Sequence, residues 1–376
     1  MIHGTIHFVQ AAALLWTAIA LLPWRPWQTG ETLDVGPSEI SEDLSDITVL
    51  IPARNEGAVI ASTLACLNRQ GQGLKVFVID DESSDRTGEI ARSTPLDSLT
   101  VICGKPRPDG WSGKLWALEQ GRVAAATAKL LLLDADISLC PGAIAALRRK
   151  MDREHLHLVS LMAAPGFGTV WELLLMPAFV YFFKLIYPFR ISNSPGGVIA
   201  AAAGGCLLID SAMLNRVGGF SAIHDALIDD CALARKVKEA KGRTWIGLTH
   251  CAKMTRCNRF SDLWRMITRT AFTQLRYSWT LLLLCTIVLV LLFIVPVAGL
   301  FTKLPGETPA IIALAMMALT YIPTLRFYGR SLLWALCLPA VGALYLAMTW
   351  ASAIDYARGR RSRWKGRDYP RLTGRV

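Results

Sequence analysis

The stretch Lys129–Ile137, KLLLLDADI, carries the strongest structural signal in the chain, because an apolar run of strand length ends in two carboxylates, Asp134 and Asp136. Four consecutive leucines predict a strand buried on both faces, which is typical of an open α/β sheet. Ligands of such sheets bind at the carboxyl ends of the strands. Hard divalent cations such as Mg²⁺ or Mn²⁺ prefer oxygen ligands and commonly bridge to phosphates, so the first hypothesis is a metal–diphosphate site. The alternative at this point is a solvated turn after the strand.

The chain is too hydrophobic for an ordinary soluble enzyme, because 53% of its 376 residues are apolar and its mean hydropathy is +0.37. Four apolar runs approach or exceed the roughly 20 residues that span a bilayer. They are Ile6–Leu22, Trp279–Leu300, Ala310–Leu325 and Ser331–Ile354. The first run lacks a basic segment before it and a small-residue cleavage site after it, so it predicts a membrane anchor rather than a cleaved signal peptide. We therefore expect an integral membrane protein.

The net charge of +11 is concentrated in the C-terminal tail, where residues 355–376 contain eight Lys or Arg against two Asp. A basic tail directly after an apolar span fits the positive-inside rule and contact with anionic lipid better than it fits a nucleic acid partner. Three full spans after a cytosolic domain would leave this tail outside, against that rule. We therefore expect either that one of the last three segments is re-entrant or that two short ones form a hairpin that does not cross, and Ala310–Leu325 is the weakest of them. The nine cysteines contain no CxxC pair, which suits a reducing cytosol.

Strand and helix patterns alternate from residue 47 to residue 162, which predicts an α/β fold with a mostly parallel sheet and helices on both faces. The expected strands are Ile47–Pro52, Leu74–Ile79, Leu99–Cys103, Lys129–Leu133 and His157–Met162, and the expected helices are Ala58–Arg69, Ser84–Arg92, Ser112–Thr127 and Pro141–Arg149. We also expect a strand of small residues over Ala200–Ile209. Its glycines, Gly204 and Gly205, either allow close approach of a sugar or lipid to the backbone or reflect loose packing of a helix.

The chain divides into six expected regions. They are a membrane anchor (1–29), a linker (30–46), an α/β domain (47–257) with an interfacial segment (170–189), an amphipathic region (258–280), C-terminal transmembrane segments (281–354) and a basic tail (355–376).

Two of the predicted strands run into polar turns, Pro52–Glu56 (PARNE) and Asp80–Thr87 (DDESSDRT). Both lie where a strand gives way to a helix, at the sheet edge where a nucleotide would bind. Neither turn is a glycine-rich phosphate cradle. We predict ligand contact for Asp81 and helix capping for Asp85.

The ordered motifs ITVLIPARNE, VIDDESSDRT, GKLWAL, LLLDADI and GGF…LIDDCAL resemble those of the family 2 glycosyltransferases, whose catalytic domain has the GT-A fold. The resemblance is closest to membrane-bound members associated with hopanoid biosynthesis. It implies that Pro52, Ala53 and Glu56 line the base pocket, that Asp81 contacts the uracil–ribose part, and that Lys114 lies near the diphosphate. It further implies that Asp134 and Asp136 form a DxD motif that binds Mg²⁺ or Mn²⁺.

The adjacent acids Asp229 and Asp230 begin a predicted helix, where its dipole also favours them. Inverting sugar transfer needs one carboxylate to take a proton from the acceptor hydroxyl. The resemblance assigns that role to Asp230, whereas Asp229 stands where the family usually has a glutamate. His224, just before this pair, is either an acceptor contact or an ordinary loop histidine.

Two further segments are expected at the membrane surface. Val170–Phe189 is almost long enough to cross, but crossing would separate Asp136 from Asp230, so we expect it to lie in the interface, with a buried core helix as the alternative. Ser261–Thr280 is amphipathic and holds Gln274 and Arg276, a shortened form of the family's (Gln/Arg)-x-x-Arg-Trp motif. These two side chains either contact acceptor or nucleotide, or reach toward lipid headgroups.

These observations predict a metal-dependent, inverting glycosyltransferase that moves a sugar from a nucleotide donor, UDP-linked by resemblance, to a membrane lipid such as a hopanoid. The catalytic domain is expected on the cytosolic side of a bacterial inner membrane, without a nucleic acid partner. The alternatives are transfer to polyprenyl phosphate or to a ceramide-like lipid, a nucleotidyltransferase, and a non-catalytic scaffold or transporter.

Overall fold

The computed structural model describes residues 2–35, 42–256, 258–301, 307–364 and 367–370. Parts of the expected linker (36–41) and basic tail (365–366 and 371–376), and the expected end of the α/β domain (257), lie outside these residues. The chain forms two compact units, which we name the sheet unit and the apolar-helix unit. The sheet unit comprises Gly30–Gly166 and Phe189–Arg256, and the apolar-helix unit comprises Met1–Thr29, Phe167–Pro188 and Cys257–Val376.

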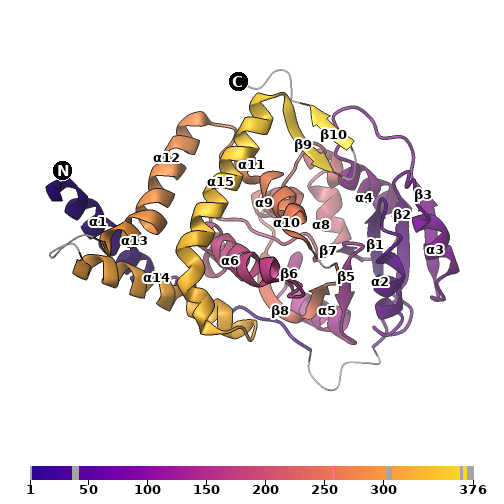
Figure 1. The fold of residues 1–376 in the computed structure, drawn as a ribbon. Coiled ribbons are helices and arrows are strands. Elements are labelled where there is room, and N and C mark those ends of the chain that lie inside the picture. Colours follow the sequence, from indigo (N-terminus) through magenta and orange to yellow (C-terminus); the bar gives the residue numbers. More distant parts are fainter. Residues whose placement is uncertain (1, 36–41, 257, 302–306, 365–366, 371–376) are drawn as a thin grey trace. The chain divides into compact units, whose positions relative to one another are not determined.

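The sheet unit is built on an eight-stranded mixed sheet (Figure 1). In chain order its strands are β1 (Ile47–Ala53), β2 (Lys75–Asp80), β3 (Leu99–Cys103), β4 (Lys129–Leu133), β5 (Ile137–Leu139), β6 (Leu158–Ala164), β7 (Cys206–Asp210) and β8 (Thr244–Met254). Their order across the sheet is β3-β2-β1-β4-β7-β6-β8-β5. The four strands from β3 to β4 are parallel, whereas β7 pairs antiparallel with both β4 and β6. The predicted α/β class is therefore confirmed.

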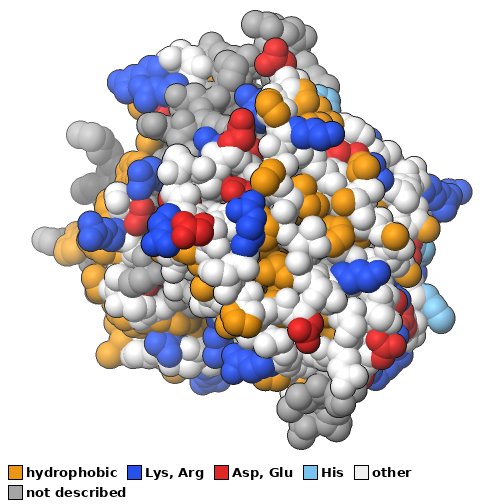
Figure 2. All heavy atoms as spheres, turned by 90° about the vertical axis from the view of Figure 1, so that its right-hand side faces the viewer, with side chains coloured by type: hydrophobic (Ala, Val, Ile, Leu, Met, Phe, Trp, Pro, Cys, Tyr) orange, Lys and Arg blue, Asp and Glu red, His pale blue; other side chains and the backbone are white. Residues whose placement is uncertain are grey.

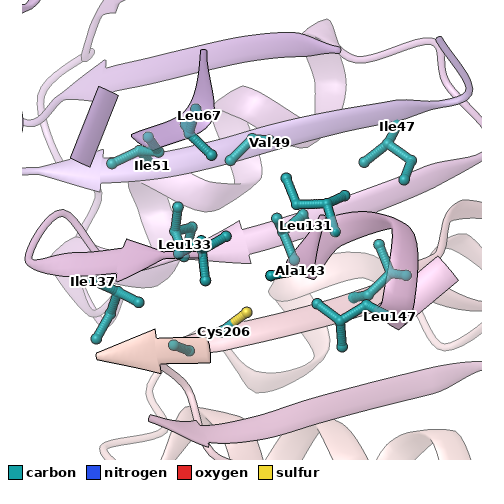
Figure 3. Close-up of a cluster of buried hydrophobic side chains, with 14 of the residues drawn as sticks. Ile47, Val49, Ile51, Leu67, Leu131, Leu133, Ile137, Ala143, Leu147 and Cys206 are labelled. Atoms are coloured by element: carbon teal, nitrogen blue, oxygen red, sulfur yellow. The ribbon is translucent and has the colours of Figure 1, made fainter. Parts of the chain in front are cut away.

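The leucines of β4 alternate between two hydrophobic cores, one on each face of the sheet. Leu131 and Leu133 join the core that is covered by α2 (Ile60–Leu67) and α5 (Ala143–Arg153), with Ile47, Val49 and Ile51 of β1 beside them (Figure 3). Leu130 and Leu132 join the other core, under α4 (Gly113–Ala124), α8 (Ser211–Arg216) and α9 (Asp229–Glu239). Each fully buried leucine contributes about 2 kcal/mol. This double burial holds the end of β4, and the acids that follow it, in a fixed place.

The remaining helices of the sheet unit are short: α3 (Thr87–Ser93), α7 (Phe189–Ser192) and the 3₁₀ turn η1 (Gly219–Ile223). The expected strand over Ala200–Ile209 begins only at Cys206. The reason is that the preceding backbone bonds to side chains instead of to a neighbouring strand. Ala201 N–H donates to Ser192 Oγ at 3.0 Å, and Ala203 N–H donates to Ser160 Oγ at 2.9 Å.

The described part of the expected linker packs onto the sheet unit. Leu33 N–H donates to the Leu248 carbonyl at 3.0 Å, and Leu248 N–H donates to the Glu31 carbonyl at 2.8 Å. Asp34 accepts hydrogen bonds from Thr249 and His250 of the same strand. The segment therefore runs beside β8, because its backbone groups are paired there.

The apolar-helix unit contains three helical segments that are long and apolar enough to cross a membrane: Trp279–Gly299, Glu307–Phe327 and Leu332–Ala357. In element terms this unit consists of α1 (Ile2–Leu21), α6 (Val170–Ile186), α10 (Phe260–Thr268), α11 (Ala271–Gln274), α12 (Trp279–Leu289), the π segment η2 (Val290–Ile294), α13 (Val295–Gly299), α14 (Glu307–Phe327), the 3₁₀ segment η3 (Leu332–Cys337), α15 (Leu338–Ala357), β9 (Arg360–Trp364) and β10 (Arg367–Pro370). Within the described residues, the apolar part of α1 is shorter, Ile6–Leu21.

Helix α6, expected in the membrane interface with its aromatic face toward lipid, packs against other helices of the apolar-helix unit. Tyr181 is fully buried, and its hydroxyl lies 2.8 Å from the Thr320 hydroxyl of α14. Tyr345 of α15 donates to the Leu175 carbonyl at 3.0 Å. Among the aromatic side chains of α6, Tyr181 is therefore covered by protein, whereas Trp171 is exposed.

Basic side chains are dispersed over the face of the molecule in Figure 2, where lysines and arginines lie among acidic and apolar side chains. Among the residues that the structure describes, the basic side chains on this face do not form one continuous stripe.

Candidate active site

The carboxyl ends of β1, β2 and β4 bring the polar turns predicted from the sequence to one edge of the sheet unit. Ala53 pairs with Asp80 across β1 and β2, and Asp81 N–H donates to the Ala53 carbonyl at 2.8 Å. On the other side, Asp134 N–H donates to the Gly205 carbonyl at 3.0 Å. Strand pairing therefore sets the spacing between the turn after β2 and the acids after β4.

Lys114 lies at the centre of a cluster of acidic side chains. It stands in the first turn of α4, whose start is capped by Ser112, which accepts from Leu115 N–H at 3.3 Å. Lys114 Nζ lies 2.8 Å from Asp134 Oδ1 and 3.5 Å from Asp229 Oδ2. Burial opposes the charge of the amine, but the neighbouring carboxylates outweigh it and raise the pKa of Lys114. Lys114 is therefore a permanent cation at this site.

Asp230 is the acid of this cluster whose properties suit proton transfer. Burial, with the adjacent charge of Asp229, raises the pKa of Asp230 to about 6. Hydrogen bonds from Cys231 N–H, at 2.7 Å, and Gly204 N–H oppose this rise. A Cβ atom at Gly204 would lie 3.3 Å from both Asp230 Oδ2 and Lys114 Nζ, which explains a glycine at this position.

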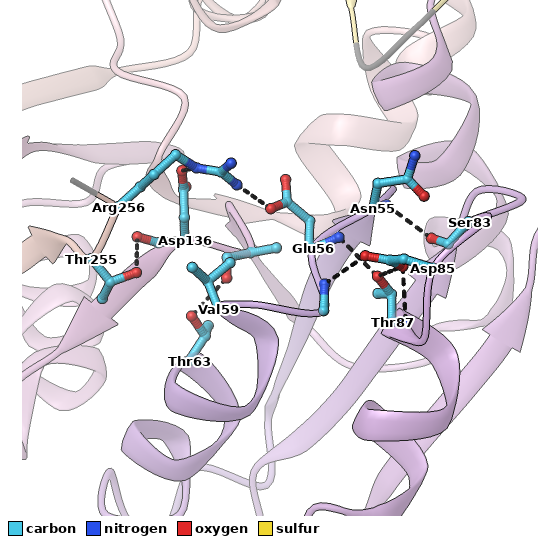
Figure 4. A network of polar contacts seen from close by, with 12 residues as sticks. Asn55, Glu56, Val59, Thr63, Ser83, Asp85, Thr87, Asp136, Thr255 and Arg256 are labelled. Atoms are coloured by element: carbon cyan, nitrogen blue, oxygen red, sulfur yellow. Dashed lines mark hydrogen bonds and ion pairs between the residues drawn. The ribbon is translucent and has the colours of Figure 1, made fainter. Parts of the chain in front are cut away.

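Asp136, the second acid after β4, faces a different cation (Figure 4). Arg256, which follows β8, has its Nε 3.4 Å from Asp136 Oδ2, and its terminal nitrogen contacts the carboxylate of Glu56. Thr255 donates to the Asp136 carbonyl through its backbone N–H at 2.8 Å and its hydroxyl at 2.9 Å. Burial disfavours the charge of Arg256, but Glu56 and Asp136 raise its pKa.

The two strand-to-helix turns are tied together by Asp85 (Figure 4). Its carboxylate accepts from Gly57 N–H at 3.1 Å and from Thr87 N–H at 2.9 Å, at the start of α3. Thr87 in turn accepts from Glu56 N–H at 2.8 Å. Although burial acts in the opposite direction, these bonds lower the pKa of Asp85. Asp85 therefore supports the start of α3 from the position before the N-cap, which is Arg86 and not Asp85 as predicted, and it also links that helix to the turn that carries Glu56.

The other residues expected at the donor site lie along the same edge. Pro52 and Ala53 end β1, and Asp81 is fully buried behind them. The Asp81 carbonyl accepts from Arg54 at 2.5 Å. These residues therefore border the turn that carries Glu56.

The three residues with an expected acceptor or gating role lie in different units. His224 is exposed in the sheet unit, with its ring centroid 5.7 Å from that of Trp111. Its carbonyl accepts from Ser112 N–H at 2.7 Å, which connects the loop before α9 to the start of α4. Gln274 and Arg276 belong to the apolar-helix unit, where Gln274 accepts from the Tyr187 hydroxyl at 2.8 Å.

The donor atoms at this edge suit a hard divalent cation. Among the described residues no three His, Cys, Asp or Glu side chains converge on a metal-binding point. Mg²⁺, however, is commonly held by one or two carboxylates together with substrate phosphates. Carboxylates here outnumber the cations paired with them, Lys114 and Arg256, so a negative excess remains for a metal to neutralise.

Sequence reasoning missed Arg256 and Ser112. The only local signal for Arg256 is a basic residue directly after an apolar strand, and its partner Asp136 is 120 positions away in the chain. Ser112 had a clearer signal, because serine before a helical pattern is a common N-cap.

Parts of the chain are similar to known glycosyltransferases. Residues 48–218 match the model of Glycosyl transferase family 2. The chain is 35% identical over 98 residues to the 4,4'-diaponeurosporenoate glycosyltransferase of Staphylococcus haemolyticus, and 36% identical over 103 residues to the probable glycosyltransferase YdaM of Bacillus subtilis. Each alignment covers 26% of this chain and only about a quarter of the relative, 26% and 24% respectively.

Among solved structures, the chain resembles a mannosyltransferase from Pyrobaculum calidifontis, determined in complex with GDP-Man and Mn²⁺. The TM-score is 0.53 at 20% identity, over 93% of this chain and 98% of the other. At this identity the likeness shows the fold. The matched family model and this likeness agree in indicating a glycosyltransferase domain with the GT-A fold.

Proposed function

We propose that the chain is a metal-dependent, inverting glycosyltransferase that moves a sugar from a nucleotide donor to the hydroxyl group of a membrane lipid. The observation that carries this proposal is Asp230. A carboxylate with a pKa of about 6, held beside a permanent cation, suits a general base at neutral pH.

In this proposal Asp230 takes the proton of the acceptor hydroxyl as its oxygen attacks the sugar. Asp229 raises the basicity of Asp230 by like-charge repulsion. Lys114 holds Asp134 and Asp229 in place and supplies positive charge near the departing diphosphate. The resulting displacement inverts the configuration of the sugar, because attack and departure occur on opposite sides.

The donor is proposed to be a UDP-sugar, with its nucleoside against Pro52, Ala53, Glu56 and Asp81. Mg²⁺ or Mn²⁺, held by Asp134 and Asp136, would neutralise charge on the diphosphate leaving group. The residues of the two turns orient the nucleoside, since Asp85 and Thr87 fix the backbone at Gly57 and Glu56.

A lipid acceptor is supported by two observations. The chain has three helices that are long and apolar enough to cross a membrane, and its Staphylococcus haemolyticus relative is named for 4,4'-diaponeurosporenoate, a carotenoid acid. His224 and Trp111 offer an aromatic surface beside the loop that leads to Asp230. We propose a polycyclic lipid alcohol of the hopanoid type, used at the cytosolic face of a bacterial inner membrane.

A second candidate function is transfer to a lipid carboxylate, which the name of that relative favours. Because a carboxylate is already ionised at neutral pH, it needs no general base. The perturbed pKa of Asp230 favours the alcohol, whose proton must be removed.

The experiment is a comparison of membrane lipids by mass spectrometry from cells with and without the chain, followed by transfer assays on a hopanoid alcohol, a carotenoid acid and undecaprenyl phosphate. A glycosylated alcohol that depends on the chain is the expected product. Exclusive transfer to the phosphate or to the acid would overturn the proposed acceptor.

A further inference from the structure

Arg256 bridges two acids that the proposed function gives to different parts of the donor complex (Figure 4). Asp136 is a proposed metal ligand, and Glu56 is a proposed nucleoside contact. Arg256 Nε lies 3.4 Å from Asp136 Oδ2, and its terminal nitrogen contacts Glu56 Oε2. The Glu56 side chain is 10% exposed and that of Asp136 is 22% exposed, whereas Arg256 remains 38% exposed. Arg256 is therefore the most solvent-exposed of the three side chains.

The backbone next to Arg256 is fixed, whereas its side chain is 38% exposed to solvent. The two hydrogen bonds from Thr255 hold the chain at the Asp136 carbonyl. A guanidinium keeps its charge at every physiological pH and pairs well with phosphate. A divalent cation that approaches Asp136 meets this positive charge, so the two cations compete for one carboxylate.

We propose that Arg256 is a donor-binding residue that occupies Asp136 and Glu56 until the diphosphate of the donor draws it away. This inference rests on the proposed function. The diphosphate offers the guanidinium a more highly charged partner than either carboxylate. When the guanidinium moves to the diphosphate, Asp136 becomes free to bind the metal. The nucleotide consequently strengthens binding of the metal, and the metal strengthens binding of the nucleotide. Part of this mutual effect depends on Arg256.

The test measures binding and needs no turnover. Mn²⁺ affinity is determined by electron paramagnetic resonance on the full-length protein in detergent, without and with UDP, for the wild type and for Arg256→Met. In the variant Mn²⁺ alone binds more tightly, UDP alone binds more weakly, and the factor by which UDP strengthens Mn²⁺ binding falls about fivefold or more. Direct Mn²⁺–UDP contact persists in both proteins, so the difference between their coupling factors reports Arg256.

Two further variants make the result specific. Arg265→Met removes an exposed arginine that pairs with Asp262 on α10, and it is expected to behave as the wild type. Arg256→Lys keeps one charge but cannot bridge two acids, so its coupling factor lies between the others; it serves as the test if the methionine variant does not fold.

An unchanged coupling factor, with or without a loss of thermal stability, would show that Arg256 is only a structural bridge. Sugar transfer by the wild type is measured separately. Active transfer with unchanged coupling overturns this inference alone, whereas a wild type that binds neither UDP nor Mn²⁺ overturns the proposed function as well.

Discussion

At the scale of single residues, Asp230 combines a catalytic advantage with a cost in stability. A folded-state pKa of about 6 lies above the ordinary value of 3.8, so the folded protein holds this proton more tightly than the unfolded chain. Stability from this group is therefore present at low pH and is lost as the pH rises from about 4 to about 6. At neutral pH the enzyme carries an unfavourably placed negative charge at the position where the proposed mechanism needs a base.

This balance predicts opposite effects of one substitution. Asp230→Asn is expected to lower kcat on a lipid alcohol by about 10²- to 10⁴-fold, because the general base is lost. At pH 7 its melting temperature should equal or exceed that of the wild type, because the amide carries no charge. Steady-state kinetics and thermal unfolding check the two effects. A variant that unfolds at lower temperature would contradict the assigned environment, and unchanged kcat would contradict the role as base.

The neighbouring cation predicts a shift in the pH profile. The rate should fall as the pH drops through the pKa of Asp230, since only the carboxylate accepts a proton. Lys114 lowers that pKa, so Lys114→Met should move the acid limb of kcat/KM to higher pH. It should also destabilise the fold by about 1 to 2 kcal/mol, because Asp134 and Asp229 lose their partner in a partly exposed site.

The matched control for this shift is Lys75→Met, which removes an exposed lysine at the start of β2. It should leave the pH profile unchanged. An acid limb that stays in place in the Lys114 variant would show that the lysine does not act on the group that titrates.

Residues differ in how far the sequence reveals them. Asp81 and Asp134 directly follow their strands. An apolar run that ends in an acidic residue, within a series of alternating strands and helices, is enough to predict their position at the sheet edge. Arg256 could not be predicted in this way, because its contacts with Glu56 and Asp136 depend on how distant strands pair. The contacts of Lys114 with Asp134 and Asp229 also depend on how distant strands pair, although the motif around Lys114 is recognisable in the sequence.

At the scale of elements, α9 is anchored at both ends. Its first turn carries Asp230, and near its other end Lys238 Nζ donates to the carbonyls of Ser192 at 2.6 Å, Gly197 at 3.1 Å and Ile199 at 2.7 Å. The chain that follows these carbonyls leads to Gly204, whose N–H bonds Asp230. Lys238 is therefore a positioning residue for the proposed base.

This arrangement predicts that Lys238→Met lowers kcat although it removes nothing from the site. The loss of charge-assisted hydrogen bonds should cost about 1 to 2 kcal/mol, and residues 193–199 should exchange their amide hydrogens faster. Lys236→Met, on the same helix, removes a half-exposed pair with Glu239 and should cost less than about 0.5 kcal/mol. Equal behaviour of the two variants would argue against the anchoring role.

Elements that the sequence indicates well are those with one strong hydrophobic pattern. The run Lys129–Leu133 forms β4 over the same residues, because all four leucines find a core. The segment 30–46 has no such pattern, so its pairing with β8 could not be read from it. Helix α6 was harder for another reason: its composition suits a membrane surface and a helix bundle equally, and no local pattern indicates the contact of Tyr181 with Thr320.

At the scale of the whole molecule, three candidate spans follow the sheet unit, and three full crossings would place that unit and the basic tail on opposite sides of the membrane. The positive-inside rule favours both on the cytosolic side, which requires an even number. Of the three segments, Glu307–Phe327 has the lowest mean hydropathy and the largest buried share, and it contains Pro323. We therefore predict that α14 enters the membrane without crossing it.

Reporter fusions after Gly299, Phe327 and Val376 test this topology. Alkaline phosphatase, which is active only outside the cytosol, should be active after Gly299 and Phe327 and inactive after Val376. Green fluorescent protein should give the opposite pattern, because it fluoresces on the cytosolic side. A crossing α14 would make the Phe327 fusion inactive as a phosphatase and the Val376 fusion active. That pattern would leave the tail outside, and the positive charge of residues 355–376 would then not determine the orientation of this protein.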